Sequence, residues 1–270
     1  MSYPGSITYF SLRTYGESVD EVFYLEKKRV KTMKIAASTL ERFVKKVSLG
    51  GTILSINLDF KEDGLYSCVK SSDDVVLTNV FLSEKAFVNY KALGEIFIKD
   101  TNTFIKYLKT FGSIVELVVS DKYMLKIFDS AREAYVMLGA EIVCENVWRK
   151  KLPTVPTTER VLLSKDQLAR TVADVSLLKI NQVCIKKSEA KLLFEVGQLD
   201  ESDFFVNSVE AKEQTNGVAS VKVGASFATL FTALDGDVEF KLGVDVPLIV
   251  TEEKDHMKFI CYIAPMVESK

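Results

Sequence analysis

One structural unit recurs four times along this chain of 270 residues: a strand, then a helix, then three strands. Apolar residues with helical spacing begin near positions 38, 101, 164 and 225. One strand-like segment precedes each helix and three follow it, with turn signals such as KEDG between them. A repeat of fixed period constrains the whole architecture, because a single copy cannot bury its apolar face alone. The sequence therefore predicts an α+β fold of four β-α-β-β-β repeats.

Two of the four helices are predicted to begin at a capping box. In this motif a serine side chain binds the backbone N–H three residues later, and the side chain there binds the serine N–H in return. The pairs are Ser38 with Glu41 in the first helix and Ser164 with Gln167 in the third. Each pair predicts the residue at which its helix begins.

The four repeats fall into two halves with a dissimilar segment between them. That segment contains Pro153, Pro156, several threonines and the only tryptophan, Trp148, and it has no apolar periodicity. Such a composition is typical of a connector. We therefore predict an N-terminal extension of unknown role, a first domain, an interdomain connector and a second, similar domain, at residues 1–30, 31–143, 144–158 and 159–270. The simplest role for Trp148 is to anchor the connector on a sheet.

The composition argues against several kinds of function. A net charge of −2 gives no strong overall attraction to nucleic acid, so any such binding depends on where the charges lie. The four cysteines are far apart and His256 is the only histidine, so no zinc site is expected. Reduced thiols, the absence of a signal peptide and the absence of an apolar stretch of ~20 residues predict a soluble, intracellular protein of a reducing compartment. That compartment is the nucleus, the cytoplasm or a nucleoid, depending on the host.

No constellation of residues indicates catalysis. The sequence has no Gly-rich phosphate loop and no G-x-S-x-G motif, and its acidic pairs, such as Glu252-Glu253, lie in apparent hairpin turns. Adjacent residues of a strand point to opposite faces, so these pairs are poorly placed for shared chemistry. We expect no enzymatic activity, no cofactor and no metal site.

The outward faces of three helices are mainly cationic, although the chain is nearly neutral. They carry Arg42, Lys45 and Lys46 on the first helix, Lys106 and Lys109 on the second, and Lys165 and Arg170 on the third. Acidic residues gather in the turns instead. This segregation predicts an inner basic surface that contacts the phosphates of duplex DNA without regard to base sequence. On any single helix, an ordinary solvated face explains the same pattern.

The apolar alternation continues almost to the last residues, where Pro265 interrupts it in MKFICYIAPMVESK. This segment follows DVPL at 245–248 and contains Ile263-Ala264-Pro265. Both elements resemble the C-terminal end of the eukaryotic and archaeal DNA sliding clamps, the proliferating cell nuclear antigen (PCNA) family. DQLARTVADVS also resembles the first helix of that family's second domain, and the pattern agrees over roughly residues 30–268. The resemblance implies two clamp domains whose helices line a DNA channel and whose sheets lie outside.

The resemblance also implies a function and partners. Clamps of this family form head-to-tail rings, usually homotrimers, that encircle duplex DNA and act as polymerase processivity factors. DNA polymerase and other replication proteins dock on them through short motifs, and a clamp-loader ATPase opens the ring. By this resemblance the docking pocket consists of Val147, Trp148, Pro247, Ile263, Ala264, Pro265 and Val267. The strands that join subunits carry Tyr135 and Met137 in the first domain and Phe204, Phe205 and Val206 in the second.

Simpler explanations stay open for both sites. Pro265 can serve only to finish an edge strand and block sheet-to-sheet association, and Phe204 to Val206 can be buried within one chain. The unmatched first 30 residues, the nearly neutral charge and a fourth helix without a basic residue indicate a divergent clamp, for example a viral one. The alternatives are a monomeric or dimeric viral processivity subunit, a subunit of a heterotrimeric checkpoint-type clamp, and a structural or interaction protein without a DNA role.

Overall fold

A computed structural model describes residues 32–121, 123–141, 144–179, 182–188, 191–197, 204–210, 218–224 and 226–266. The first half contains β1 (Met33–Ala36), α1 (Ala37–Val47), β2 (Ile56–Lys61), β3 (Gly64–Lys70), β4 (Val76–Ser83), η1 (Glu84–Ala86), β5 (Phe87–Val88), β6 (Gly94–Ile98), α2 (Thr101–Leu108), β7 (Ile114–Asp121), β8 (Met124–Phe128) and β9 (Glu133–Met137). The second half contains β10 (Glu159–Leu163), α3 (Lys165–Leu178), β11 (Gln182–Ser188), β12 (Lys191–Val196), β13 (Phe205–Glu210), β14 (Ala219–Gly224), α4 (Ser226–Ala233), β15 (Val238–Leu242), β16 (Leu248–Lys254) and β17 (Met257–Ile263). Each helix follows one strand and precedes three, and the short η1 and β5 are added between the first two units.

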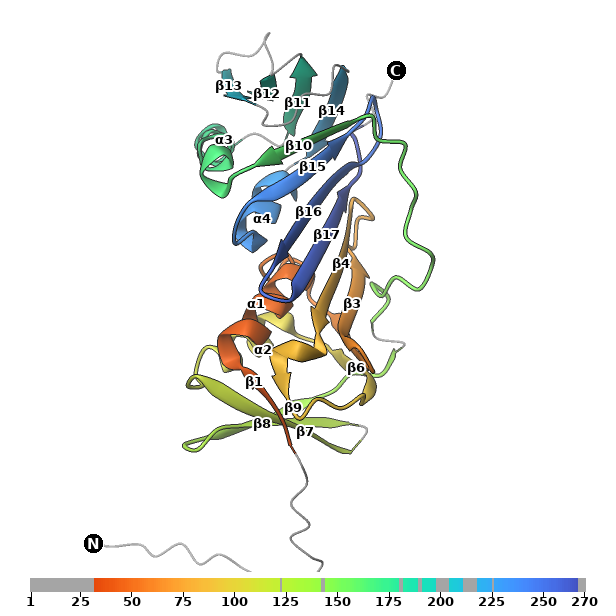
Figure 1. The fold of residues 1–270 in the computed structure, drawn as a ribbon, viewed down its shortest axis with the longest axis vertical. Coiled ribbons are helices and arrows are strands. Elements are labelled where there is room, and N and C mark those ends of the chain that lie inside the picture. The colour runs from red at the N-terminus through yellow and green to blue at the C-terminus, as the bar shows by residue number, and fades with distance from the viewer. Residues whose placement is uncertain are drawn as a thin grey trace, which may run out of the picture. The chain divides into compact units, whose positions relative to one another are not determined.

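The strands of the described chain form three antiparallel sheets. Their strand orders are β5-β1-β7-β8-β9, β10-β15-β16-β17-β4-β3-β2-β6 and β13-β12-β11-β14. The eight-stranded sheet takes strands from both halves, because β17 pairs with β4 from Met257↔Leu82 to Ile263↔Val76. In Figure 1, β16, β17, β4 and β3 lie side by side, with the helices along one face and the connector along the other. The two halves therefore share one central sheet.

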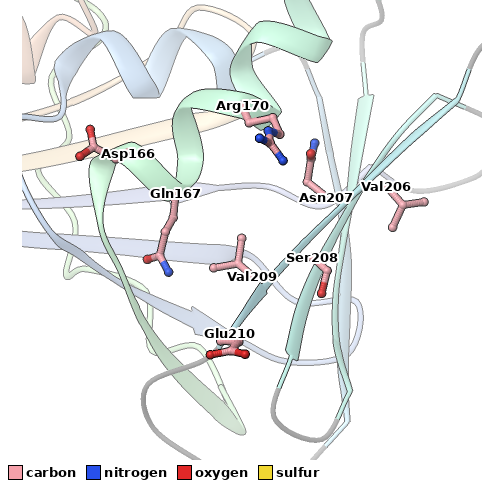
Figure 2. Close-up of a pocket in the computed structure, with 8 residues that line it drawn as sticks. All are labelled: Asp166, Gln167, Arg170, Val206, Asn207, Ser208, Val209 and Glu210. Carbon is pink, nitrogen blue, oxygen red and sulfur yellow. The ribbon is translucent and has the colours of Figure 1, made fainter.

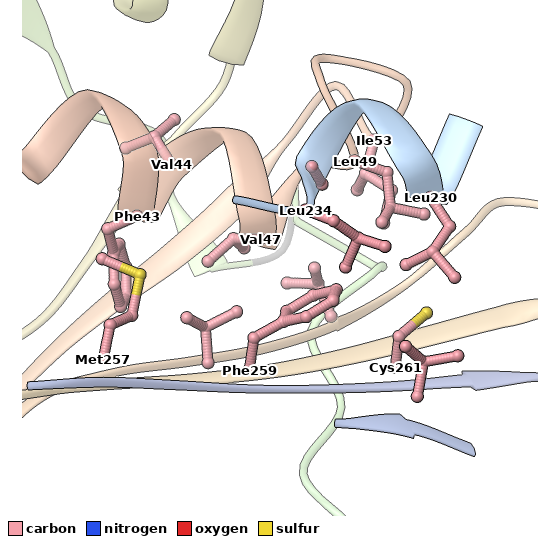
Figure 3. Close-up of a cluster of buried hydrophobic side chains, with 14 of the residues drawn as sticks. Phe43, Val44, Val47, Leu49, Ile53, Leu230, Leu234, Met257, Phe259 and Cys261 are labelled. Carbon is pink, nitrogen blue, oxygen red and sulfur yellow. The ribbon is translucent and has the colours of Figure 1, made fainter. Parts of the chain in front are cut away.

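An apolar core beneath the helices also joins the two halves. Phe43 and Val47 of α1 lie over Phe259 of β17, and Leu230 and Leu234 from the second half belong to the same cluster (Figure 3). All five side chains are buried, and burying each one stabilises the fold by about 1.5–3 kcal/mol. Within the helix layer α1 packs against α2 and α4, and α4 packs against α3. The helix layer is thus as continuous across the halves as the sheet.

The helix starts follow the capping prediction in one case and contradict it in the other. The capping box of α3 is confirmed: the Gln167 N–H donates to Ser164 Oγ and the Ser164 N–H donates to Gln167 Oε1. The predicted box at Ser38 is wrong, because α1 continues directly from β1 with Ala36 as N-cap and no side-chain cap. The Ala37 N–H instead donates to the carbonyl of Ser113, 3.1 Å away. Tertiary contact replaces the local cap there.

The start of the connector is held as a short extension of the central sheet. Strand β2 pairs with β3 only over residues 59–61, so the far half of β3 has an open edge. Val147 forms an antiparallel bridge with Val69 at this edge, and the Trp148 N–H donates to the Cys68 carbonyl at 2.9 Å. The anchoring of the connector by its tryptophan segment is therefore visible in the backbone hydrogen bonds.

The last described residues cross from one sheet to another. The Ala264 N–H donates to the carbonyl of Val75 at 2.8 Å, and the Met266 N–H donates to the carbonyl of Lys222 in β14, also at 2.8 Å. Ile263, the final residue of β17, is completely buried. The apolar end of the chain thus has a structural use, which is to tie the four-stranded sheet to the central one.

No helix among the described residues is long and apolar enough to cross a membrane. The same part of the chain contains no group of three or more His, Cys, Asp or Glu side chains that could hold a metal ion. All four cysteines are free thiols.

Candidate nucleic-acid interface and docking site

Helix α2 presents two cations to solvent. Lys106 and Lys109 are exposed, and neither ammonium group pairs with a carboxylate in the described part of the chain. Asp100 caps the helix by accepting from the backbone N–H and the hydroxyl of Thr103, and these hydrogen bonds hold the pKa of Asp100 below its usual 3.8. The cap fixes the start of α2, and both lysines follow near its C-terminal end, where a positive charge is favourable for the helix dipole.

On helix α1 the predicted outward position of Lys46 is wrong. Its side chain is only 3% exposed, with Nζ 2.9 Å from Asp235 and 2.5 Å from Glu252. Nζ also donates to the carbonyl of Ala233 at 2.7 Å and lies 5.4 Å from the ring centroid of Phe259. The cause is tertiary: α1 packs against α4, so this side of the helix faces the second half rather than solvent. Lys46 holds the two halves together and does not belong to a DNA-facing surface.

The other two cations of α1 are also compensated, but they are nearer the surface. Arg42 Nη1 lies 2.8 Å from Asp255 in the β16–β17 turn, and Nε lies 3.7 Å from Asp235. This contact with the Arg42 guanidinium lowers the pKa of Asp255 below its usual 3.8. Lys45 is 38% exposed and pairs with Glu41 one turn earlier, at 2.7 Å. Of the three, Lys45 is the best placed to reach a phosphate.

The two predicted cations of α3 have different surroundings. Lys165 Nζ donates to the carbonyl of Leu234 at 2.6 Å and lies 5.4 Å from the Phe231 ring centroid, so it caps the C-terminal end of α4. Arg170 is exposed and has no carboxylate partner among the described residues. Asp174, one turn further along α3, accepts from Asn207 Nδ2 at 2.6 Å and does not pair with Arg170. Of the seven cations that the sequence predicts to face DNA, three therefore have no partner among the described residues: Lys106, Lys109 and Arg170.

Arg170 lies beside an edge strand rather than alone on an open helix face. It lines a hollow of about 410 Å³ between α3 and β13, together with Gln167 and Val209. Figure 2 shows the Arg170 side chain directed toward Asn207 of β13. A cation in this position can contact either a phosphate or whatever packs against β13.

Two edge strands carry exposed apolar side chains. Strand β9 is the outer strand of the five-stranded sheet, and β13 is the outer strand of the four-stranded sheet. Tyr135 and Met137 on β9 are 52% and 69% exposed, and Phe205 and Val206 on β13 are 38% and 51% exposed. The predicted edge residues thus lie on open edges, where unpaired backbone groups are available for another strand. Phe204, which precedes β13, is half-buried.

The predicted docking pocket corresponds in part to a hollow of about 400 Å³ on the face of the central sheet away from the helices. This face can be identified from Thr78, whose side chain points toward the helices because its hydroxyl donates to the Val47 carbonyl of α1. The side chain of its neighbour Leu77 therefore points away from the helices. The hollow is lined by Lys70, Asp74, Val75, Val76, Leu77, Trp148, Lys150, Pro153, Pro247, Tyr262 and Ala264. Burial raises the pKa of the Tyr262 phenol above its usual 10.0. The result is an apolar depression with a few polar groups at its rim.

Three of the seven predicted pocket residues line this hollow: Trp148, Pro247 and Ala264. The prediction for Ile263 is wrong, because this side chain points into the core on the other face of β17. Val147 lines a neighbouring polar hollow of about 280 Å³, and Pro265 is half-buried outside both. Val267 lies outside the described residues.

The side of the hollow that comes from the β3–β4 turn and from β17 was not predicted from the sequence. Strand alternation could have identified Tyr262, because its neighbour Ile263 is apolar and the two must face opposite ways. No comparable signal links Val75 and Leu77 to the C-terminal segment. Their proximity results from the pairing of β4 with β17, which joins residues far apart in the chain.

The repeated strand–helix–strand order, the helix layer and the shared central sheet define the class of fold, a DNA clamp. No protein-family model matches the chain, and no curated protein matches it significantly. The structure of A. fulgidus PCNA bound to the C-terminal region of FEN-1 is similar, with a TM-score of 0.75, 19% identity and coverage of 88% of this chain and 99% of the other.

Two further solved structures agree with this likeness. PCNA from Entamoeba histolytica has a TM-score of 0.73 at 16% identity, covering 87% of this chain and 98% of the other. The PCNA2–PCNA3 complex from Sulfolobus tokodaii has a TM-score of 0.68 at 16% identity, with the same coverage of 87% and 98%. The chain therefore has the fold of the PCNA sliding clamps, as its C-terminal segment predicts.

Proposed function

We propose that this chain is the subunit of a DNA sliding clamp, a ring that encircles duplex DNA and holds replication proteins on it. The observation that carries the proposal is the clamp fold, which extends over 88% of the chain. Three features of the described surface supply what such a ring needs: free cations on the helix layer, two open apolar edge strands and an apolar hollow beside the connector. The proposed role is that of a processivity factor, which tethers and does not catalyse.

Ring closure is assigned to β9 of one copy and β13 of the next. A head-to-tail contact between two different surfaces gives a closed ring when its rotation closes, and the proposed ring is a homotrimer. Pairing of the two strands satisfies open backbone edges and covers Tyr135, Met137, Phe205 and Val206, which are exposed in the single chain. Burying four such side chains at one junction favours closure.

DNA contact is assigned to Lys106, Lys109 and Arg170, with Lys45 as an additional group. All four are at the surface, and the first three have no carboxylate partner among the described residues. Lysine and arginine contacts to phosphates give affinity without base recognition, which suits a protein that moves along DNA. Lys46 and Lys165 are excluded from this set, because their ammonium groups are bound within the protein.

Docking of partners is assigned to the hollow beside the connector. The comparison structure of A. fulgidus PCNA holds the C-terminal region of FEN-1, so a clamp of this fold binds a terminal segment of another protein. We extend this to a DNA polymerase and other replication proteins with short docking motifs, and to a clamp-loader ATPase that opens the ring. An apolar hollow of about 400 Å³ is within the size range of ~300–1,000 Å³ typical of ligand pockets.

The test uses duplex DNA whose two ends can be blocked, so that no loader is needed. A closed ring threads over free ends, so protein added before streptavidin blocks biotinylated ends should be trapped and resist high salt. Protein added after blocking should not be trapped. Light scattering on the same sample should give about three times the chain mass of 30.3 kDa. A single-chain mass with salt-labile binding in both orders would instead indicate an open processivity subunit.

Two variants assign the trapping to the proposed surfaces. Val206→Asp places a charge in the proposed β9–β13 junction and should give a single-chain mass without trapping. Lys106→Ala with Lys109→Ala should weaken association at low salt and lower the slope of log affinity against log salt by about 2, at ~0.9 for each lost phosphate contact. The matched control is Lys85→Ala with Lys91→Ala, two exposed lysines outside the helix layer. Equal effects of the two pairs would remove α2 from the DNA interface.

A further inference from the structure

The hollow beside the connector has an unmatched positive charge at its rim. Lys150 lines the hollow and is exposed, and no carboxylate in the described part of the chain pairs with it. Its neighbour Lys151 is exposed and unpaired in the same way. The other lining cation, Lys70, is already paired with Asp74. The remaining acid of that turn, Asp73, is bound by the Ser71 hydroxyl and the Val75 N–H.

Trp148, which lines both this hollow and the neighbouring polar one, carries a second hydrogen-bond donor without an acceptor. Trp148 Nε1 is buried and has no hydrogen-bond partner among the described residues. The backbone that carries the indole is held in place, because the Trp148 N–H donates to the Cys68 carbonyl and the adjacent Val147 is bridged to Val69. Lys150 Nζ lies 5.7 Å from the centroid of the Trp148 ring. The Trp148 ring thus has the unpaired Lys150 ammonium group over its face and an N–H without an acceptor at its edge.

Neither Lys150 Nζ nor Trp148 Nε1 has a hydrogen-bond acceptor among the described residues, and the Lys150 ammonium group also has no carboxylate to balance its charge there. A carboxylate supplies both, because it is an acceptor with two oxygens and pairs with an ammonium group more strongly than a neutral acceptor does. An ammonium or guanidinium group brought to this rim would meet Lys150 and would be repelled. The apolar floor of the hollow, formed by Leu77, Pro247 and Ala264, takes an aromatic or aliphatic anchor.

We propose that this hollow selects docking segments in which a carboxylate side chain stands next to the apolar anchor, with Lys150 and Trp148 as the residues that determine this preference. The inference rests on the proposed docking function of the hollow. It adds the chemical class of the partner, which is an acidic apolar segment rather than a basic one. Because Lys150 is exposed, the preference depends on ionic strength, and the contribution of Trp148 Nε1 depends on it less.

The experiment compares three fluorescein-labelled peptides by polarisation on the full chain. All have two adjacent phenylalanines as anchors, and the flanking residue is Glu, Gln or Lys. We expect the Glu peptide to bind about tenfold more tightly than the Lys peptide at low salt, with a smaller ratio at high salt. Lys150→Glu should reverse the order, whereas Lys85→Glu, which changes an exposed lysine of η1, should leave it unchanged.

A second variant tests the indole. Trp148→Phe keeps an aromatic wall and removes the Nε1 donor, so it should weaken the Glu peptide several-fold and leave the Lys peptide unaffected. Binding of all three peptides with equal affinity, or tighter binding of the Lys peptide, would overturn the inference while docking stands. Binding of none of them would overturn the docking function itself, and the inference with it.

Discussion

Helices α1 and α2 carry similar cationic faces in the sequence, but their lysines have different roles in the structure. Lys46 of α1 is buried between two carboxylates, whereas Lys106 and Lys109 of α2 are exposed without a carboxylate partner in the described chain. The difference comes from position in the helix layer, since α1 packs against both α2 and α4. A cationic helix face therefore indicates a nucleic-acid surface only where no neighbouring element supplies carboxylates.

The largest expected effect that tests this comparison is the loss of stability in Lys46→Ala. The change leaves Glu252 buried without its cation, and breaking a buried ion pair from one side costs about 3–5 kcal/mol. Lys106→Ala, at an exposed position, should change the free energy of unfolding by less than ~0.5 kcal/mol. Urea unfolding of both variants measures the contrast. If Lys46→Ala is as stable as Lys106→Ala, the buried pair contributes little and the comparison fails.

A smaller effect distinguishes the two helix starts. Asp100→Ala removes the side-chain cap of α2 and should destabilise the protein by ~1 kcal/mol, whereas Ser38→Ala should have almost no effect because Ser38 caps nothing. The folded pKa of Asp100 is depressed, so its contribution is present above the unfolded value near 3.8 and is lost as the pH falls through the lower folded pKa. Unfolding curves at pH 7 and pH 3 measure both expectations; equal losses for the two variants would contradict the capping assignment.

The smallest expected effect concerns the ion pair between Arg42 of α1 and the exposed Asp255. Arg42→Ala removes the main cause of the lowered pKa of Asp255, so that pKa should rise toward 3.8. Stability should change little, because ion pairs with an exposed partner are weak. A side-chain carboxyl NMR titration measures the shift, with Asp129 as the internal control. The lowered pKa of Asp129 depends on the backbone N–H groups of Gly112, Ala131 and Arg132 and should not move.

Local patterns in the sequence identified the repeated elements well, because helix and strand periodicity depend on residues that are close in the chain. The capping pair at Ser164 belongs to the same category, since both partners lie within one turn. The similar pair at Ser38 failed for a non-local reason: β1 runs directly into α1, and Ser113 of another segment accepts the first N–H. A motif of two residues predicts a cap only if the backbone entering it is free to adopt the cap conformation.

The hollow beside the connector shows the same division. The C-terminal motif and the connector led to Trp148, Pro247 and Ala264, but the remaining wall comes from the β3–β4 turn and depends on the pairing of β4 with β17. Ile263 was assigned to the wrong face, although the side chain of Tyr262, one residue earlier, does line the hollow. A shift of one residue along a strand moves a side chain from the surface to the core.

The sequence by itself determined the four-fold order of strands and helices, the connector and the clamp-like end of the chain, because these depend on periodicity and on short motifs. Only the tertiary structure decided which cations are free and which side chains line the hollow. Lys46 and Glu252 are 206 positions apart in the chain, and nothing in the residues near either one predicts their contact. Whether a charge is available to a partner depends on such distances, and these are established only when the chain folds.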